Sequence, residues 1–186
     1  MQITVREGNT AHLFPALATG DLDIVVGRLP EQELPLAHTF PLVHEVLFDE
    51  SFCAVVGKGN RLALQAGLRL ADLMLHDWIF PLQESPSYNA VEKLFRGAGL
   101  GLPASHVNSL SMLTNIGMLL ETDMIALMPR AAAIQFVDSG LLMILDLPDS
   151  ANFGDVGFSI RADKEVNPAC RNFIRCLREA AREILA

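Results

Sequence analysis

The sequence predicts an α/β fold of the doubly wound kind, in which helices cover both faces of parallel or mixed sheets. Runs of β-branched, apolar residues alternate with stretches of helical periodicity along the whole chain, which is the pattern of such folds. The 186 residues, 51% of them hydrophobic, suffice for one generous core or two small ones. A predicted turn at Gly57–Asn60 separates the alternation into two runs. We therefore expect two lobes with a central cleft.

The first run predicts a strand, a helix and a second strand. Gln2–Arg6 alternates polar and apolar residues, and Asp23–Gly27 is apolar and β-branched, so both are predicted strands. The stretch between them places three apolar side chains on one helical face: Leu13, Phe14 and Leu17. Pro15 is compatible with this helix only in its first turn. Two further β-rich runs follow, at Val46–Phe48 and Phe52–Val56.

The second run continues the alternation to the C-terminus. Its β-rich apolar segments predict strands at Trp78–Phe80, His106–Asn108, Met124–Met128, Leu141–Leu145 and Val156–Ile160. Helical periodicity predicts helices at Leu70–Leu73, Asn89–Arg96, Met112–Leu120 and Ala131–Val137. A final helix begins at Asn167-Pro168, because asparagine is a good N-cap and proline is favoured in the first turn. In open α/β sheets, ligands bind beyond the carboxyl ends of the strands, where loops lead into helices.

Charge and residue spacing argue against several functions. A net charge of −8 opposes direct nucleic-acid binding, which requires clustered Lys and Arg. The three cysteines and five histidines show no metal-ligand spacing, so we expect no metal and no cofactor. The sequence contains no nucleophile elbow, P-loop or zinc-protease motif, and it is not expected to be an enzyme. No apolar run approaches the roughly 20 residues of a membrane span, and no signal segment opens the chain, so we expect a soluble, cytoplasmic protein.

Several segments together resemble the effector-binding domain of LysR-type transcriptional regulators, bacterial proteins with a winged helix-turn-helix and a periplasmic-binding-protein-like sensor. The most specific segment is Gly20-Asp21-Leu22-Asp23 leading into a predicted strand. The others are Val5–Gly8, Ile24–Leu29, Leu47–Glu50, Cys53–Gly57, Phe80–Pro86, Asn108–Ser111 and Asp123–Pro129. Two of them, Gly27–Leu29 and Asp123–Pro129, are similar to the branch that includes regulators of protocatechuate and galactose-binding-protein genes.

The resemblance implies a type 2 periplasmic-binding-protein-like fold with two Rossmann-like lobes. Lobe I would comprise residues 1–57 and 160–186, and lobe II residues 58–159. Sensor domains of this family begin with a strand and a helix that precede the position of Gln2. The sequence lacks both, as it lacks the winged helix-turn-helix. We therefore expect the sheet of lobe I to be open in its middle and the sequence to omit part of the real chain.

The resemblance also implies a small-molecule effector in the cleft, with its anionic group near helix N-termini. In lobe I, Thr10 is expected to offer the effector a hydroxyl and an N–H group; the alternative is an ordinary helix cap at Thr10 or Asn9. Arg28 is expected to bind an anionic effector, because its guanidinium is a fixed fork of donors. The alternative for Arg28 is a salt bridge to a nearby acid such as Glu7 or Asp23.

In lobe II, two predicted loops match the family's ligand-facing loops. The first contributes Ser85, Pro86, Ser87 and Tyr88, with Ser87 as a helix cap and Tyr88 as a wall that can donate a hydrogen bond. The alternative for Tyr88 is packing over the helix. The second loop contributes Ser109 and Ser111, for which helix capping is the alternative to ligand contact.

The function implied is effector sensing: the domain binds a small, anionic metabolite and signals to DNA-binding heads. Aromatic acids, sulfonates, sugars and sugar acids are the effector classes expected. The full-length protein would be a homodimer or tetramer that contacts DNA only through its N-terminal domain and contacts no membrane. Two alternatives stay open, a periplasmic-type solute-binding protein and a small-molecule lyase or dehydratase on the same architecture.

Overall fold

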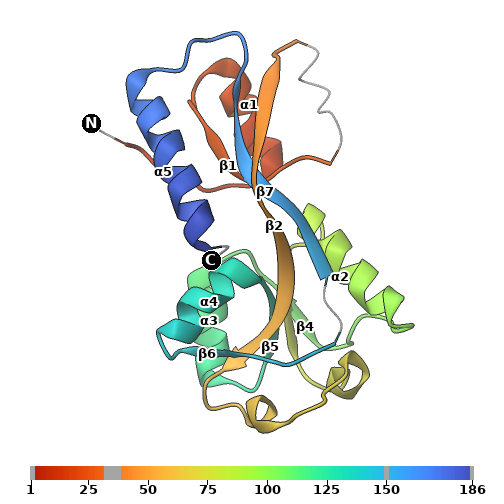
Figure 1. The fold of residues 1–186 in the computed structure, drawn as a ribbon. Coiled ribbons are helices and arrows are strands. Elements are labelled where there is room, and N and C mark those ends of the chain that lie inside the picture. The colour runs from red at the N-terminus through yellow and green to blue at the C-terminus, as the bar shows by residue number, and fades with distance from the viewer. Residues whose placement is uncertain (1–2, 32–38, 149–150, 185–186) are drawn as a thin grey trace. The chain divides into compact units, whose positions relative to one another are not determined.

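In the computed structural model, which describes residues 3–31, 39–148 and 151–184, the chain forms two compact units (Figure 1). Unit 1 contains the residues up to Asp49 and those from Gly154 onward, and unit 2 is Glu50–Phe153. Two strands carry the chain from one unit to the other, β2 (Leu42–Gly57) and β7 (Ala151–Arg161).

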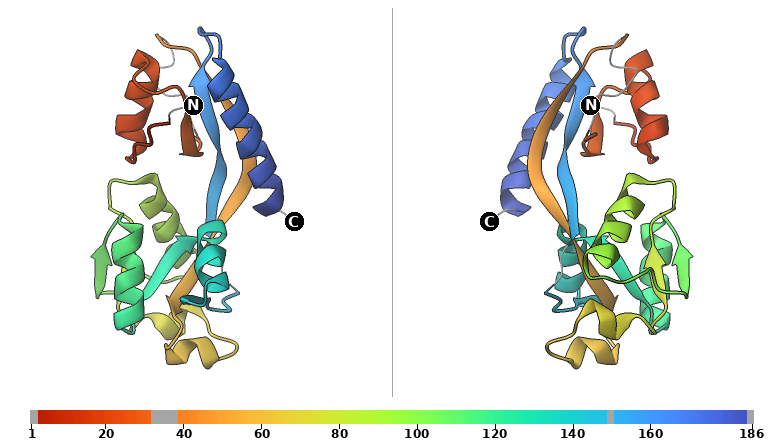
Figure 2. Two further views of the ribbon diagram at one scale, coloured as in Figure 1. Left: turned by 90° about the vertical axis from the view of Figure 1, so that its left-hand side faces the viewer. Right: turned by 90° about the vertical axis from the view of Figure 1, so that its right-hand side faces the viewer.

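Unit 1 is a small sheet with one helix on each face (Figure 2). Strand β1 (Val25–Arg28) lies at the end of the order β1-β7-β2 and pairs antiparallel with β7. Helix α1 (Thr10–Thr19) covers one face by packing Phe14 and Leu17 around Val25. Helix α5 (Pro168–Ile184) covers the other face with Cys170 and Ile174 against Phe158. The predicted cap of α5 is confirmed, since Asn167 Oδ1 accepts a hydrogen bond from the Cys170 N–H group at 2.8 Å.

Helix α1 differs from the prediction at its proline. The helix begins at Thr10, so Pro15 lies in its interior and the expected first-turn position was wrong. The proline removes one helical hydrogen bond. Burial of Phe14 and Leu17, which are 2% and 0% exposed, offsets that loss. The helix ends at Gly20, whose φ of 89° is the left-handed conformation that glycine adopts most easily.

The prediction of a strand before α1 was also wrong. The segment from Ile3 to Arg6 forms no strand, and Gln2 lies outside the described residues. A strand needs a neighbour to pair its backbone groups. Ile3 and Val5 are instead 56% and 81% exposed. The β-rich runs at Val46–Phe48 and Phe52–Val56 are both strand, and they lie within the single strand β2.

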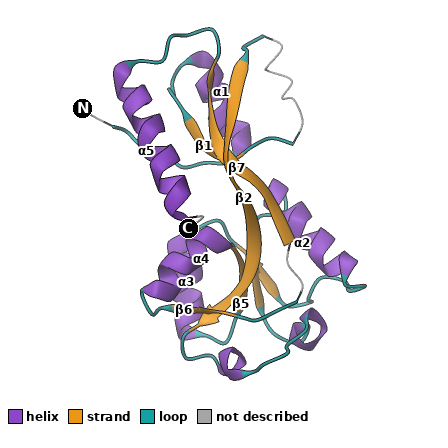
Figure 3. Ribbon diagram, viewed as in Figure 1, coloured by secondary structure: helices purple, strands orange, loops and turns teal. Residues whose placement is uncertain are grey.

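Unit 2 is a mixed sheet with helices on both faces (Figure 3). Its strands are the second half of β2 with β3 (Trp78–Phe80), β4 (His106–Asn108), β5 (Ile125–Pro129) and β6 (Leu142–Ile144). β3 pairs parallel with β4 and β5, whereas β2 pairs antiparallel with β5 and β6. The bounds of β3, β4, β5 and β6 agree with the prediction to within one residue at each end.

The helices of unit 2 cover two apolar cores. One face carries α2 (Pro86–Gly97) and the short 3-10 helices η2 (Arg61–Leu64) and η3 (Leu70–Leu73), around a core that includes Trp78, Phe80 and Phe95. The other face carries α3 (Met112–Glu121) and α4 (Arg130–Asp138), around a core that includes Ile79 and Val55. The predicted α/β class with both sheet faces covered is confirmed.

Candidate functional site

The parallel strands of unit 2 end at a common edge of its sheet. Phe80 of β3 is level with Asn108 of β4, and Ile79 is level with Ala126 of β5. Each strand is followed by a helix, so α2, α3 and α4 all begin at this edge. Helix N-termini present unpaired N–H groups and a partial positive charge. The edge is therefore suited to an anion.

The loop into α2 contains the first set of predicted site residues. Ser85 is the N-cap, and its Oγ accepts a hydrogen bond from the Tyr88 N–H group at 3.3 Å. Pro86 is the first residue of the helix. The prediction that Ser87 is the cap was therefore wrong, and Ser87 lies partly exposed in the first turn. Proline at the first helical position explains the shift, because its fixed φ favours that place.

Tyr88 lies below this loop, in the apolar core of unit 2. Its side chain is only 8% exposed and belongs to the cluster that contains Val91 and Phe95. This position agrees with the packing alternative. Tyr88 could face a ligand only through the small part of the ring that solvent reaches.

The loop into α3 brings two further predicted residues to the same edge. Ser109 Oγ accepts from the Ser111 N–H group at 3.2 Å, and Ser111 is the N-cap of α3. Ser111 Oγ accepts from both the N–H group and the hydroxyl of Thr114, at 3.3 and 2.8 Å. A hydroxyl has two acceptor positions and one proton. Ser111 is also exposed, so solvent or a ligand can reach its hydroxyl.

Direct hydrogen bonds join the two loops. Asn108 Nδ2 donates to the carbonyl of Pro81 at 2.8 Å, and the Ser109 N–H group donates to the carbonyl of Phe80 at 2.9 Å. Ser85 and Ser111 are thus the caps of two helices whose approach loops are fixed to each other.

The N-terminus of α4 is occupied by a side chain that sequence reasoning missed. Glu50 is 6% exposed, and its carboxylate accepts hydrogen bonds from the backbone N–H groups of Ala131, at 3.1 Å, and Ser51, at 2.9 Å. The sequence gives no local signal for this contact, because the two partners are 81 residues apart. Because Glu50 occupies the N-terminus of α4, the helix N-termini at this edge that a ligand can use are those of α2 and α3.

In unit 1, Thr10 and Arg28 lie toward one end of the sheet. Arg161 Nη1 donates to the Ala18 carbonyl at 3.0 Å, which places the last turn of α1 beside the end of β7. That end of β7 pairs with the beginning of β1, since Ser159 is opposite Val25. The start of α1, with Thr10, therefore lies toward the other end of β1, where Arg28 is the last residue. The cap of α1 is Asn9, whose Oδ1 accepts from the His12 N–H group at 3.1 Å.

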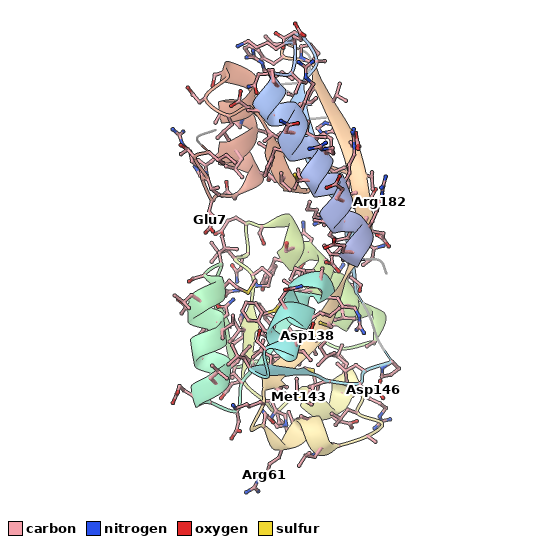
Figure 4. All side chains as sticks on the ribbon, turned by 60° about the vertical axis from the view of Figure 1, so that its left-hand side comes forward. Glu7, Arg61, Asp138, Met143, Asp146 and Arg182 are labelled. Atoms are coloured by element: carbon pink, nitrogen blue, oxygen red, sulfur yellow. The ribbon has the colours of Figure 1, made fainter. Side chains whose placement is uncertain are left out.

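Arg28 forms an ion pair, but with neither acid expected from the sequence. Its guanidinium pairs with the carboxylate of Glu31. Glu7 lies exposed on the segment before α1 (Figure 4), and Asp23 accepts a hydrogen bond from Asn167 Nδ2 at 3.5 Å. The side chain of Arg28 is 14% exposed and that of Glu31 is 65% exposed.

The described parts of the chain contain neither a cluster of metal ligands nor a membrane-spanning helix. No group of three or more His, Cys, Asp or Glu residues in them could hold a metal ion. No helix in them is long and apolar enough to cross a bilayer.

Ligand sites at strand-end loops are general to open α/β sheets. Two such units joined by two strands are typical of periplasmic-binding-protein-like domains. The sequence matches the family described as the LysR substrate binding domain over residues 1–182. The chain belongs to this family.

Individual relatives agree with this assignment. The chain is 28% identical over 184 residues to the HTH-type transcriptional regulator PcaQ of Agrobacterium fabrum, and the match covers 98% of the chain and 57% of that regulator. The chain thus spans little more than half the length of this relative.

Solved structures show the same fold. A LysR-family regulator described as putative, from Pseudomonas aeruginosa, superposes with a TM-score of 0.73 and 21% identity, over 94% of this chain and 58% of the other. The effector binding domain of QuiR in complex with shikimate superposes with a TM-score of 0.68 and 17% identity, over 95% and 79%.

Proposed function

We propose that this chain is the effector-sensing part of a LysR-type transcriptional regulator and that its effector is a small anionic metabolite. The observation that carries the proposal is the joined pair of loops in unit 2, where the Ser85 and Ser111 caps open two helices at one sheet edge. Helix N-termini favour negative charge, and an exposed serine hydroxyl such as that of Ser111 can donate to a ligand oxygen. Both features favour a ligand rich in acceptor oxygens.

We propose as effector contacts the residues expected from the sequence: Thr10, Arg28, Ser85, Pro86, Ser87, Tyr88, Ser109 and Ser111. Arg28 adds a fork of donors that fits a carboxylate or sulfonate. Several hydroxyl groups and one guanidinium are suited to a hydroxylated acid. Sugar acids and hydroxylated ring acids are therefore the effector classes that we favour most. Aromatic acids and sulfonates are the other anionic classes, whereas neutral sugars lack the anionic group. The shikimate complex of QuiR supports this chemistry, since shikimate is a hydroxylated carboxylic acid.

The regulator would act by coupling effector binding to DNA binding. An effector shifts a conformational equilibrium only through different affinities for the two states. In the full-length protein, a cytoplasmic homodimer or tetramer without enzymatic activity, the N-terminal domain would contact DNA. The relative named as an HTH-type regulator supports this reading over a solute-binding protein or a lyase.

A ligand panel on this chain tests the proposal. Thermal unfolding is followed with sugar acids, hydroxylated and aromatic acids, sulfonates and neutral sugars, because a ligand that binds the folded state raises the melting temperature. We expect an acid to stabilise the chain and Ser111→Ala to weaken its binding in calorimetry. Ser139→Ala is the matched control, since its hydroxyl donates to the Gln135 carbonyl at the far end of α4.

Two outcomes would contradict the proposal. The first is a panel in which neutral sugars stabilise the chain as well as acids do. The second is an acid whose affinity is unchanged by Ser85→Ala and Ser111→Ala. In the full-length protein, the stabilising acid should also change the operator footprint or transcription.

A further inference from the structure

Arg28, the residue expected to bind the anionic group of the effector, is already paired with a carboxylate of the same chain, that of Glu31. The two residues are three apart, at the end of β1 and just after it. The Arg28 side chain is 14% exposed and the Glu31 side chain is 65% exposed. The Arg28 side chain is therefore mostly buried, whereas the Glu31 side chain lies mostly in solvent.

The backbone of β7 fixes the position of the Arg28 side chain. Across the strand pair, Arg28 is opposite Val156, and the Leu29 N–H group donates to the Asp155 carbonyl at 2.8 Å. At Gly154 the guanidinium lies so close that an added Cβ would be 3.2 Å from Arg28 Nε. Gly154 also has a φ of 95°, which disfavours any larger residue. The Arg28 guanidinium thus packs against the β7 backbone at Gly154.

The Glu31 carboxylate is easily replaced. An ion pair with a solvent-exposed partner contributes little to stability, because water screens the charges and ordering a long side chain costs entropy. Arg28 Nε and Nη1 are buried, so a ligand carboxylate must approach through Nη2, the nitrogen that pairs with Glu31. A ligand that binds Arg28 in this way must first displace Glu31.

We infer that Glu31 is an internal competitor of the effector's anionic group: it occupies Arg28 in the free domain and lowers the affinity for carboxylate or sulfonate monoanions. This inference rests on the proposed role of Arg28 as an effector contact. Glu31 then sets the effector concentration to which the domain responds. Neutral ligands gain nothing by displacing Glu31, so the competition acts on anions alone.

Acetate is the simplest probe, because it carries the carboxylate without the rest of an effector. The Nε–H NMR signal of Arg28, assigned by its loss in Arg28→Lys, is followed during an acetate titration at constant ionic strength. Acetamide serves as the neutral counterpart. In Glu31→Gln we expect acetate to bind roughly two- to fivefold more tightly than in the wild type, the gain that removal of an exposed ion pair allows. Acetamide should shift the signal equally in both proteins.

Glu165→Gln is the matched control, since Glu165 is an exposed acid of unit 1 that pairs with Arg171 at 3.7 Å. It removes the same charge and should leave acetate binding at Arg28 unchanged. The inference is overturned if Glu31→Gln and Glu165→Gln strengthen acetate binding equally, or if acetate leaves the Arg28 signal of Glu31→Gln unmoved. Failure of the proposed function is a different result: no acid of the panel stabilises the chain, although acetate reaches Arg28.

Discussion

The carboxylate of Glu50 accepts a hydrogen bond from the backbone N–H group of Ala131 at 3.1 Å and so caps helix α4 from a distant strand. Glu50 begins the part of β2 that belongs to unit 2, and it is almost completely buried. A buried carboxylate is tolerated only when protein groups replace its water. The N–H groups of Ala131 and Ser51 do so, and the contact joins β2 to the start of α4.

We expect Glu50→Gln to destabilise unit 2. Glutamine has the same shape, but it carries no negative charge and it accepts hydrogen bonds through one oxygen only. One of the two N–H groups loses its acceptor, which costs about 1–3 kcal/mol for a buried group. Urea unfolding measures the change, and Asp49→Asn, which neutralises the exposed neighbouring acid, is the control. Equal stabilities for the two variants would show that the capping contact contributes nothing.

Gly57, at the end of β2, should not tolerate a larger residue. A Cβ added there would lie 2.1 Å from the carbonyl oxygen of Leu119, which is backbone and cannot rotate away. Gly57→Ala must therefore separate β2 from α3, at a cost of about 1–3 kcal/mol for an overpacked site. Gly59→Ala is the control, because a Cβ there meets nothing within 4 Å. The close approach is refuted if both variants unfold at the same urea concentration.

Local patterns predicted the elements that depend on local chemistry. Trp78–Phe80 and His106–Asn108 are strands at the predicted bounds. For Trp78–Phe80 the reason is local, because a short apolar run between turns is typical of a buried strand. Asn167 caps α5 as predicted, since its partner is three residues away. Contacts between distant segments were not predictable: the cap that Glu50 provides for α4 joins residues far apart in sequence.

The errors have the same origin. Residues 3–6 alternate like a strand, yet alternation describes only the faces of a strand and says nothing of a pairing partner. The interior position of Pro15 depends on where α1 begins, and the cap at Asn9 was one of two possibilities. At the candidate site, the sequence indicated helix capping by serine, and Ser85 and Ser111 are N-caps in the structure. The pairing of Arg28 with Glu31 depends on the path of the backbone after β1, and the residue pattern does not predict that path.

The three cysteines should differ sharply in reactivity. Burial raises the pKa of the Cys53 thiol to about 11, and burial also raises the pKa of Cys170. Cys176 is exposed on α5. Only the thiolate reacts with alkylating reagents. Brief iodoacetamide treatment at pH 8 should therefore modify Cys176 alone, which peptide mass spectrometry resolves, and all three should react in urea. Modification of Cys53 in the folded chain at the rate of Cys176 would contradict its burial.

His44 should make unit 1 less stable in mild acid. Its Nδ1 lies 2.7 Å from the hydroxyl of buried Ser159 on β7, and its ring meets the edge of Phe14 at a centroid distance of 6.1 Å. Desolvation lowers the pKa of His44 below its ordinary value of 6.5. The unfolded chain therefore binds the proton more readily than the folded chain does.

The sign of the effect follows from that difference. The contribution of His44 to stability is fully present above pH 6.5 and is lost as the pH falls through the folded-state pKa below it. Urea unfolding of the wild type between pH 8 and pH 5 should show a decline that His44→Gln reduces. His12→Gln, which changes an exposed histidine of the same unit, should retain the decline. The same decline in all three proteins would mean that groups other than His44 cause it, and that this histidine titrates equally in the folded and unfolded chain.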